Sequence, residues 1–199
     1  MKTEIKPATL RDLCYTAANA REIDKKEIFA SGPRTMQECG TLTWSAMYHW
    51  GGIGWCCWVE DNPEYAFGFT PQSPFQPWLW SAWGWGTDKA VYAMPEVIRW
   101  CKANLVPMLD SVGAIRVEAR ALENNDDSIR WLKWMNFKYD CDLPRWGRDG
   151  LTFVQLSWLR EEFPGFDKYG NVVRKRGTDH VLRRQSTDLP ATAPTAAVD

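Results

Sequence analysis

Cysteine and histidine side chains bind metals and act as nucleophiles or acid–base groups, so their spacing is the first test for chemistry. The chain has six cysteines and two histidines. Zinc ligands usually come in close pairs such as Cys-x-x-Cys, and no two cysteines here have that spacing. We therefore expect no metal site. We predict free, mostly buried thiols at Cys14, Cys39, Cys56, Cys57, Cys101 and Cys141.

Tryptophan is unusually abundant, with thirteen residues, seven of which cluster in segments 50–58 and 78–85. Aromatic clusters can stack on bases or hold sugars. No Lys or Arg lies between the tryptophans of either segment, which disfavours base stacking. We predict that the tryptophans pack in the core or at a protein interface.

The overall composition limits the class of protein. The 199 residues, 45% hydrophobic, are enough for one domain with a core, and the net charge of −1 predicts no general attraction to nucleic acid or anionic membranes. No apolar run approaches the roughly 18 residues of a membrane span, and the first residues lack the apolar segment of a secretion signal. We expect a soluble intracellular protein.

The first half of the chain predicts a short strand, helices and then strands. After a strand at Glu4–Pro7, Thr9 should cap a helix that ends at Gly32-Pro33, and Thr35 should cap a short second helix at Met36–Cys39. Strands should follow at residues 55–59, 65–69 and 78–85. In the last of these strands, regular alternation would place Trp78 and Trp80 on one face and Trp83 and Trp85 on the other. A strand buried on both faces explains this pattern, and so does a bulge near residues 81–82.

Residues 112–140 carry the clearest pattern. Apolar and charged residues alternate from Ile115 to Arg120, which predicts a half-buried strand, and Asn125 begins a run of helix-capping residues. A helix through Met135 and a strand at Phe137–Tyr139 should follow. Before this unit, the main helix should begin at Pro95 and end near Asn104; after it, a strand pair should occupy Trp146–Leu159, joined near Gly147–Gly150.

Two segments resemble the GCN5-related N-acetyltransferase superfamily. Ile5–Asp12 resembles its opening strand and turn, and Asn125–Phe137 resembles its Asn-x-x-Ala…Gly-Phe segment. The order of strands and helices is also typical of that superfamily, over roughly Glu4 to Arg160. The resemblance implies an α+β fold in residues 1–160, with a central mixed, mostly antiparallel sheet flanked by helices.

A narrower resemblance is to small acetyltransferase-like proteins of tailed bacteriophages. Trp83–Asp88 contains their Gly-Thr-Asp motif, and Val117–Arg120 followed by Ile129–Leu132 is similar to their next strand and helix. Some of these proteins are internal virion proteins of short-tailed phages. This resemblance implies a product in the host cytoplasm or in the virion, with phage virion proteins or host proteins as partners.

The superfamily binds the pyrophosphate of acetyl-coenzyme A with backbone N–H groups at a helix start, in a loop written Gln/Arg-x-x-Gly-x-Gly/Ala. The resemblance places Gly84, Trp85, Gly86 and Thr87 in this loop, with Ser81 where Gln or Arg is usual. It also makes Asn125 a candidate cofactor contact.

The resemblance also bears on the catalytic groups. Glu118, in the strand beside the expected acyl site, is the candidate general base. Leu132 takes the position of the tyrosine that often protonates the leaving thiolate.

Two functions stay open. The chain is either a non-catalytic module for virion assembly or host interaction, with a degenerate acyl-coenzyme A site, or an active N-acetyltransferase that moves acetyl from acetyl-CoA to an amine, on a host protein for example. Residues 161–199 should form a flexible tail. Its basic part, 168–184, predicts a weak nucleic-acid contact, and its end is rich in Ala, Pro and Thr.

Overall fold

The structure is a computed structural model that describes residues 1–160, so the predicted basic and Ala/Pro/Thr-rich tail lies outside the described residues. Along the chain, one strand and three helices come first, three strands follow, and two further helices then alternate with the last strands. The elements are β1 Thr3–Pro7, α1 Leu10–Ala18, α2 Glu22–Ser31, α3 Met36–Trp50, β2 Ile53–Val59, β3 Asn62–Pro71, β4 Leu79–Gly86, α4 Ala90–Ser111, β5 Arg116–Leu122, α5 Asp126–Trp134, β6 Lys138–Leu143 and β7 Phe153–Leu159.

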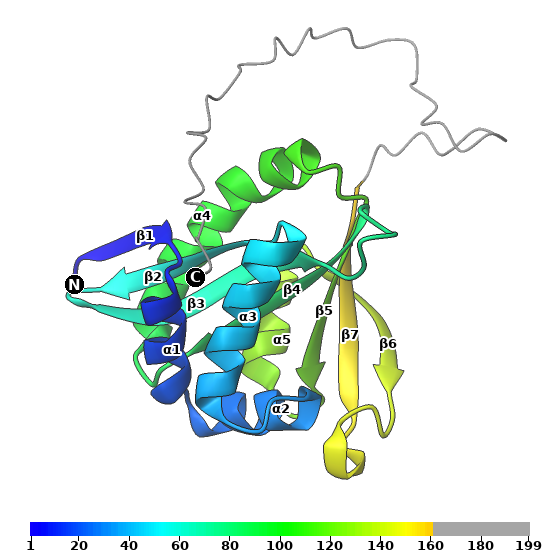
Figure 1. Cartoon of the computed structure of the whole chain (residues 1–199), viewed down its shortest axis with the longest axis horizontal. Coiled ribbons are helices and arrows are strands. Elements are labelled where there is room, and N and C mark those ends of the chain that lie inside the picture. Colours follow the sequence, from blue (N-terminus) through cyan, green and yellow to red (C-terminus); the bar gives the residue numbers. More distant parts are fainter. Residues whose placement is uncertain (161–199) are drawn as a thin grey trace, which may run out of the picture. The chain divides into compact units, whose positions relative to one another are not determined.

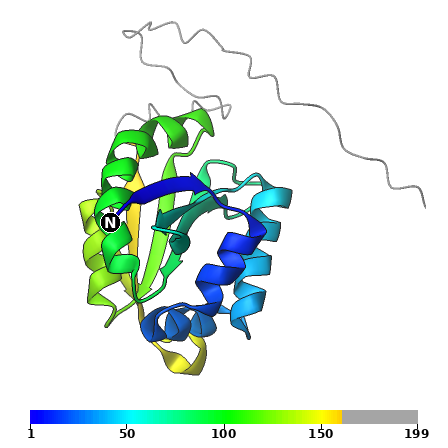
Figure 2. The same ribbon diagram turned by 90° about the vertical axis from the view of Figure 1, so that its left-hand side faces the viewer.

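One mixed sheet forms the centre of the described part, with strand order β1-β2-β3-β4-β5-β7-β6. Neighbouring strands are antiparallel except β4 and β5, which are parallel. Helices α1 to α3 lie on one face and α4 and α5 on the other (Figures 1 and 2). The predicted α+β fold with a mostly antiparallel sheet is confirmed.

Strand β4 is buried on both faces. Trp80 and Trp85 are each 3% exposed and belong to different core clusters. The pairing of β4 with β3 runs from Pro71–Trp80 to Tyr65–Gly86 without a shift of register. The alternation of tryptophan parity therefore reflects two covered faces, and the bulge that was the other explanation is absent from this strand.

Helix α4 is longer than predicted and passes through both of its prolines. The buried positions Ala93, Val97, Cys101, Leu105 and Leu109 form one stripe against the sheet. Pro95 and Pro107 lie on the exposed face, so the carbonyl groups that lose their N–H partners face water. Burial of the stripe therefore outweighs the local cost of two prolines.

The N-terminal helices also differ from the prediction. The single helix expected from Thr9 is broken at Ala20–Arg21, where the chain contacts the end of β4: Ala20 forms a bridge with Thr87, and the Arg21 N–H donates to the Gly86 carbonyl at 2.9 Å. The helix that Thr35 caps was predicted to be short, but it extends to Trp50. The contacts of Ala20 and Arg21 with the end of β4 are long-range, so no local sequence signal predicts the break between α1 and α2.

The C-terminal strands need one correction. Residues 146–152 form a turn around Arg148–Gly150 in place of the first member of the predicted pair. Strand β7 pairs instead with β5 and β6. Within residues 1–160 all the cysteines are free, and no group of three His, Cys, Asp or Glu side chains is placed to hold a metal ion. No helix in that part is long and apolar enough to cross a membrane.

Candidate functional site

Strands β4 and β5 separate part-way along their length. Their parallel pairing covers Leu79–Ser81 and Arg116–Glu118, whereas β4 continues to Gly86 and β5 to Leu122. The far edge of β5 stays paired with β7 throughout. Beyond Ser81 and Glu118 the facing edges of β4 and β5 therefore carry backbone N–H and C=O groups that no ladder joins. We call this V-shaped gap the splay.

Two cavities meet at the splay. One, of about 80 Å³, lies toward α4 and α5 and is lined by Ala119, Ala121 and Leu132, among others. The other, of about 240 Å³, lies toward α2 and α3 and is lined by Ile28 and Thr43, among others. The cavities share six lining residues: Glu27, Ala82, Trp83, Gly84, Arg120 and Ser128. The two cavities are therefore adjacent at the splay and are separated by these shared side chains.

Glu27 of α2 is the carboxylic acid that both cavities share. Burial raises the pKa of Glu27 to about 7; the hydrogen bond from Asn125 opposes this rise, and the nearby charge of Asp24 adds to it. A carboxyl group with a pKa near neutrality can accept and release a proton at physiological pH. The structure therefore places an acid–base group where the two cavities join.

Asn125 holds this carboxyl group in place. Its Oδ1 accepts from the Ser128 N–H at 3.3 Å, as the predicted N-cap of α5, and its Nδ2 donates to Glu27 Oε2 at 2.6 Å. The residue is 3% exposed. Asn125 thus contacts the acid of the splay, and a coenzyme contact for it stays a prediction.

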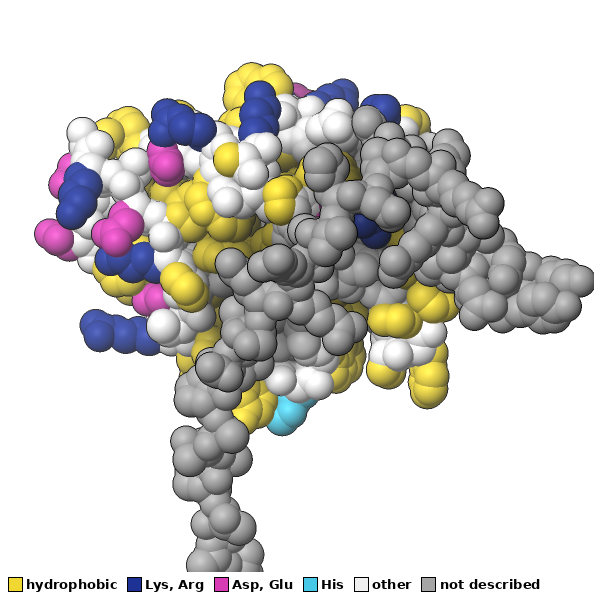
Figure 3. All heavy atoms as spheres, turned by 90° about the horizontal axis from the view of Figure 1, so that it is seen from above, with side chains coloured by type: hydrophobic (Ala, Val, Ile, Leu, Met, Phe, Trp, Pro, Cys, Tyr) yellow, Lys and Arg dark blue, Asp and Glu magenta, His cyan; other side chains and the backbone are white. Residues whose placement is uncertain are grey.

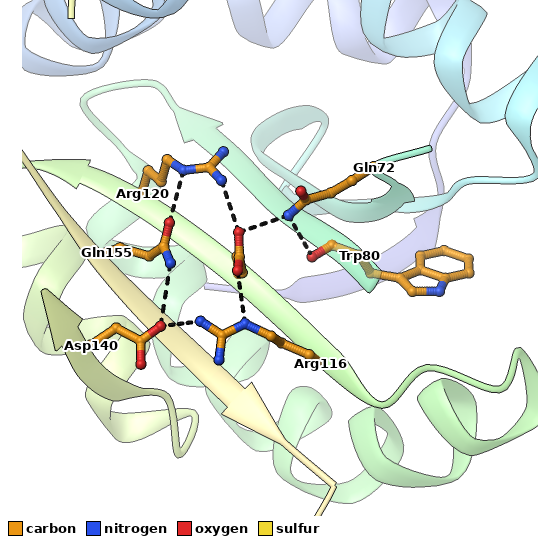
Figure 4. A network of polar contacts seen from close by, with 7 residues as sticks. Gln72, Trp80, Arg116, Arg120, Asp140 and Gln155 are labelled. Atoms are coloured by element: carbon orange, nitrogen blue, oxygen red, sulfur yellow. Dashed lines mark hydrogen bonds and ion pairs between the residues drawn. The ribbon is translucent and has the colours of Figure 1, made fainter. Parts of the chain in front are cut away.

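Glu118, the base expected from the sequence, lines the larger cavity, but other side chains hold its carboxylate. Its carboxylate accepts from Arg116 Nε at 2.7 Å, from Arg120 at 2.8 Å and from Gln72 Nε2 at 2.9 Å, in a network that also includes Asp140 and Gln155 (Figure 4). Burial alone would raise the pKa of Glu118, but these hydrogen bonds and the two guanidinium charges lower it. A carboxylate held ionised by three donors is a poor proton acceptor, which disfavours the base role.

Known structures share this arrangement of strands and helices, whereas no protein-family model and no curated protein sequence matches the chain. The protein yncA of Salmonella typhimurium, assigned as an acetyltransferase and solved with acetyl-CoA, superposes with a TM-score of 0.66 at 15% identity. That match covers 83% of this chain and 98% of yncA. The ribosomal-protein-alanine N-acetyltransferase of Brucella melitensis gives 0.63 at 14% identity, over 79% and 99% of the two chains. The chain has the GCN5-related acetyltransferase fold.

The glycines that the resemblance assigned to a phosphate loop serve packing in this version of the acetyltransferase fold. A Cβ on Gly84 would lie 2.7 Å from the hydroxyl oxygen of Tyr65. A Cβ on Gly86 would lie 2.5 Å from Ala90 Cβ and 2.7 Å from Tyr65 Cδ2. Trp85, between them, is buried with α1 to α3 and stacks on Trp83. Protein side chains therefore fill the space that glycine leaves open.

Three N–H donors of this turn, those of Gly86, Thr87 and Lys89, are also occupied. The Gly86 N–H donates to Asp24 Oδ2 at 2.8 Å and the Thr87 N–H to the Glu64 carbonyl at 2.9 Å. The Thr87 hydroxyl hydrogen-bonds to the Glu64 carboxylate and accepts from the Lys89 N–H. A diphosphate needs free N–H groups at this position of the acetyltransferase fold, so the residues present do not fit the diphosphate of acetyl-CoA. The small side chains of the splay do leave room for a short acyl arm.

Sequence reasoning missed two residues that the acetyltransferase fold brings to the splay. Tyr65 of β3 lines the smaller cavity, and burial is the main cause that raises its pKa, so its hydroxyl keeps its proton. Glu27 lies one helical turn after Asp24, next to the buried Ile28. Asp24, Glu27 and Ile28 have the i, i+3, i+4 spacing of one helix face, so the two acids share the face of an apolar residue; this was the available signal.

Proposed function

We propose that this chain is an N-acyltransferase that moves a short acyl group from a thioester to an amine, with Glu27 as general base. The observation that carries the proposal is the position of Glu27 at the junction of the two cavities, with a pKa of about 7. The wider similarity to acetyltransferase structures supports the same reaction class by analogy of fold.

The donor side of the proposal rests on the splay. Unpaired edge groups of β4 and β5 can hydrogen-bond an extended amide chain in the manner of an added strand. Ala82, Ala119 and Ala121 leave a cavity of about 80 Å³, which suits a short acyl group and is too small for a nucleotide. A thioester supplies an electrophilic acyl carbon there. The diphosphate of acetyl-CoA has no preformed position, so the acyl-pantetheine end must provide the affinity.

The acceptor side of the proposal is the larger cavity. Trp83, Trp146 and Ile28 give it apolar walls, and Glu27 is an acid with no ion pair among the described residues. An ammonium group would be attracted to the Glu27 carboxylate and transfer a proton to it. The free amine nitrogen then bonds to the acyl carbon as the carbon–sulfur bond breaks. The protonated Tyr65 is the nearby candidate to supply a proton to the leaving thiolate, and its phenolate then takes the second proton that the acylated nitrogen must lose.

Acyl transfer by the purified protein tests this function. We expect mass spectrometry to detect acylation across a panel of primary amines with S-acetylpantetheine as donor. Acetyl-CoA should give a kcat/KM within about threefold of that value, because the nucleotide adds little binding energy. Failure to acylate any amine with either donor would contradict the proposal.

A second function has its own support. A fold retained as a non-catalytic module for virion assembly or host interaction needs no free N–H groups for a coenzyme phosphate. The N–H groups of Gly86 and Thr87 are both occupied, as this second function expects. Large apolar side chains such as Leu42, Tyr48, Trp50 and Phe75 are exposed, and in Figure 3 hydrophobic side chains lie among basic and acidic ones on the visible face. This module would bind phage virion or host proteins. Detection of the protein in purified phage particles, together with no acyl transfer in the assay, would favour the second function.

A further inference from the structure

Asp24 of α2 reaches the turn between β4 and α4 from a distant part of the sequence. Its Oδ2 accepts from the Gly86 N–H at 2.8 Å across 62 positions, and the residue is 5% exposed. Arg21, three residues before Asp24, also contacts Gly86, because its backbone N–H donates to the Gly86 carbonyl. A buried carboxylate therefore accepts from a backbone N–H at the last residue of β4, just before the turn that leads into α4.

Arg21 completes this arrangement. Its Nε and terminal nitrogen donate to the two oxygens of Asp24 at 3.2 and 2.7 Å, and its guanidinium lies 4.9 Å from the ring centre of Trp131. A fork of this kind matches a phosphate as well as a carboxylate. Three N–H groups thus converge on Asp24, and each of them would also suit a phosphate oxygen.

We propose that the Asp24 carboxylate occupies the anion position of the β4–α4 turn and thereby excludes the diphosphate of nucleotide-bearing ligands. Its charge repels phosphate, and its oxygens use the donors that phosphate needs. Removal of the carboxylate leaves the Gly86 N–H and the Arg21 guanidinium without their anion. Both then favour a ligand phosphate. This inference concerns ligand binding alone and does not need the chain to transfer an acyl group.

The wild-type protein gives the first test, which requires no variant. Calorimetric titration should give coenzyme A and pantetheine dissociation constants within about threefold of each other, because the diphosphate finds no donors. A wild-type affinity for coenzyme A about tenfold or more above that for pantetheine would overturn the proposal.

Variants give the second test. In Asp24→Ala we expect coenzyme A to bind about tenfold tighter than in wild type, with pantetheine unchanged; Asp24→Asn, which keeps its shape but not its charge, should gain less. Glu22→Gln removes an exposed carboxylate from the same helix and should gain nothing. Adding Arg21→Ala to Asp24→Ala should abolish the gain. Unchanged coenzyme A affinity in a folded Asp24 variant, checked by circular dichroism, would refute the proposal, whether or not wild type transfers acyl groups.

Discussion

The side-chain amide of Asn125 donates to the Glu27 carboxylate at 2.6 Å, although 98 positions separate the two residues. Asn125 is also the N-cap of α5. One side chain therefore joins the start of a helix on one face of the sheet to the proposed base from a helix on the other face. This contact runs beside the splay that separates β4 from β5.

Replacing Asn125 by Ser should separate these two roles. A serine hydroxyl can still cap α5, but Glu27 loses its amide donor. Because that hydrogen bond opposes the raised pKa of Glu27, we expect the midpoint of the pH–rate profile to move upward in Asn125→Ser. Asn125→Ala loses the cap as well, and its free energy of unfolding should fall by about 1 kcal/mol more. An unmoved midpoint in the serine variant would leave Asn125 with the capping role alone.

Glu27→Gln should stabilise the protein at alkaline pH. The pKa of Glu27 is raised from 4.5 to about 7, so its contribution to stability is fully present below about 4.5 and is lost as the pH rises through about 7. Glutamine keeps an oxygen for Asn125 and has no charge to bury. In denaturant unfolding, the free energy of unfolding of Glu27→Gln should exceed that of wild type by about 1–3 kcal/mol at alkaline pH and by much less at acidic pH. A difference that does not change with pH would contradict the raised pKa.

Glu118→Gln should affect stability and leave catalysis in place. The lowered pKa of Glu118 means that its ionised form stabilises the fold above about 4.5 and that this contribution disappears as the pH falls through the lowered value. At neutral pH we expect a loss of about 1–3 kcal/mol, because Arg120 loses its anion and Arg116 keeps only Asp140. Glu123→Gln, at an exposed position, is the matched control. Loss of acyl transfer without loss of stability would instead favour Glu118 as the base.

Gly86→Ala should test whether this glycine serves packing. Its Cβ would lie 2.5 Å from Ala90 Cβ, so we expect a loss of about 1–3 kcal/mol in thermal unfolding. Ala90→Gly in the same chain removes one of the two clashing atoms and should restore part of the loss. If Gly86→Ala unfolded like wild type but bound coenzyme A less well, the glycine would belong to a ligand site.

The sequence predicted much of the fold because some elements carry local signals. Alternation in β5, the capping side chains at Asn125 and Thr35 and the tryptophans of β4 all led to elements that the structure contains. The extent of α4 was wrong since its prolines face solvent while the opposite face is buried. Local propensity marks a boundary there, and tertiary packing overrides it.

The candidate site was harder to predict, because its chemistry arises from contacts between distant segments. Glu27 gains its raised pKa from burial against residues far along the chain, and Asp24 contacts Gly86 across 62 positions of sequence. Glu118 lies in the expected strand, but only the structure shows that Arg116, Arg120 and Gln72 hold its carboxylate. Residue type and spacing predict the strand, but they do not predict which distant side chains contact Glu118.

The rate of acyl transfer by Glu27→Gln beside Glu22→Gln tests the central claim most directly. Both variants change a glutamate of α2 to its amide, but Glu27 lines the two cavities and Glu22 is exposed. With S-acetylpantetheine and a primary amine, we expect Glu27→Gln to lose about 100-fold or more in kcat and Glu22→Gln to match wild type, whose rate should rise with an apparent pKa of about 7. A Glu27→Gln variant with the wild-type rate and pH profile would contradict the account.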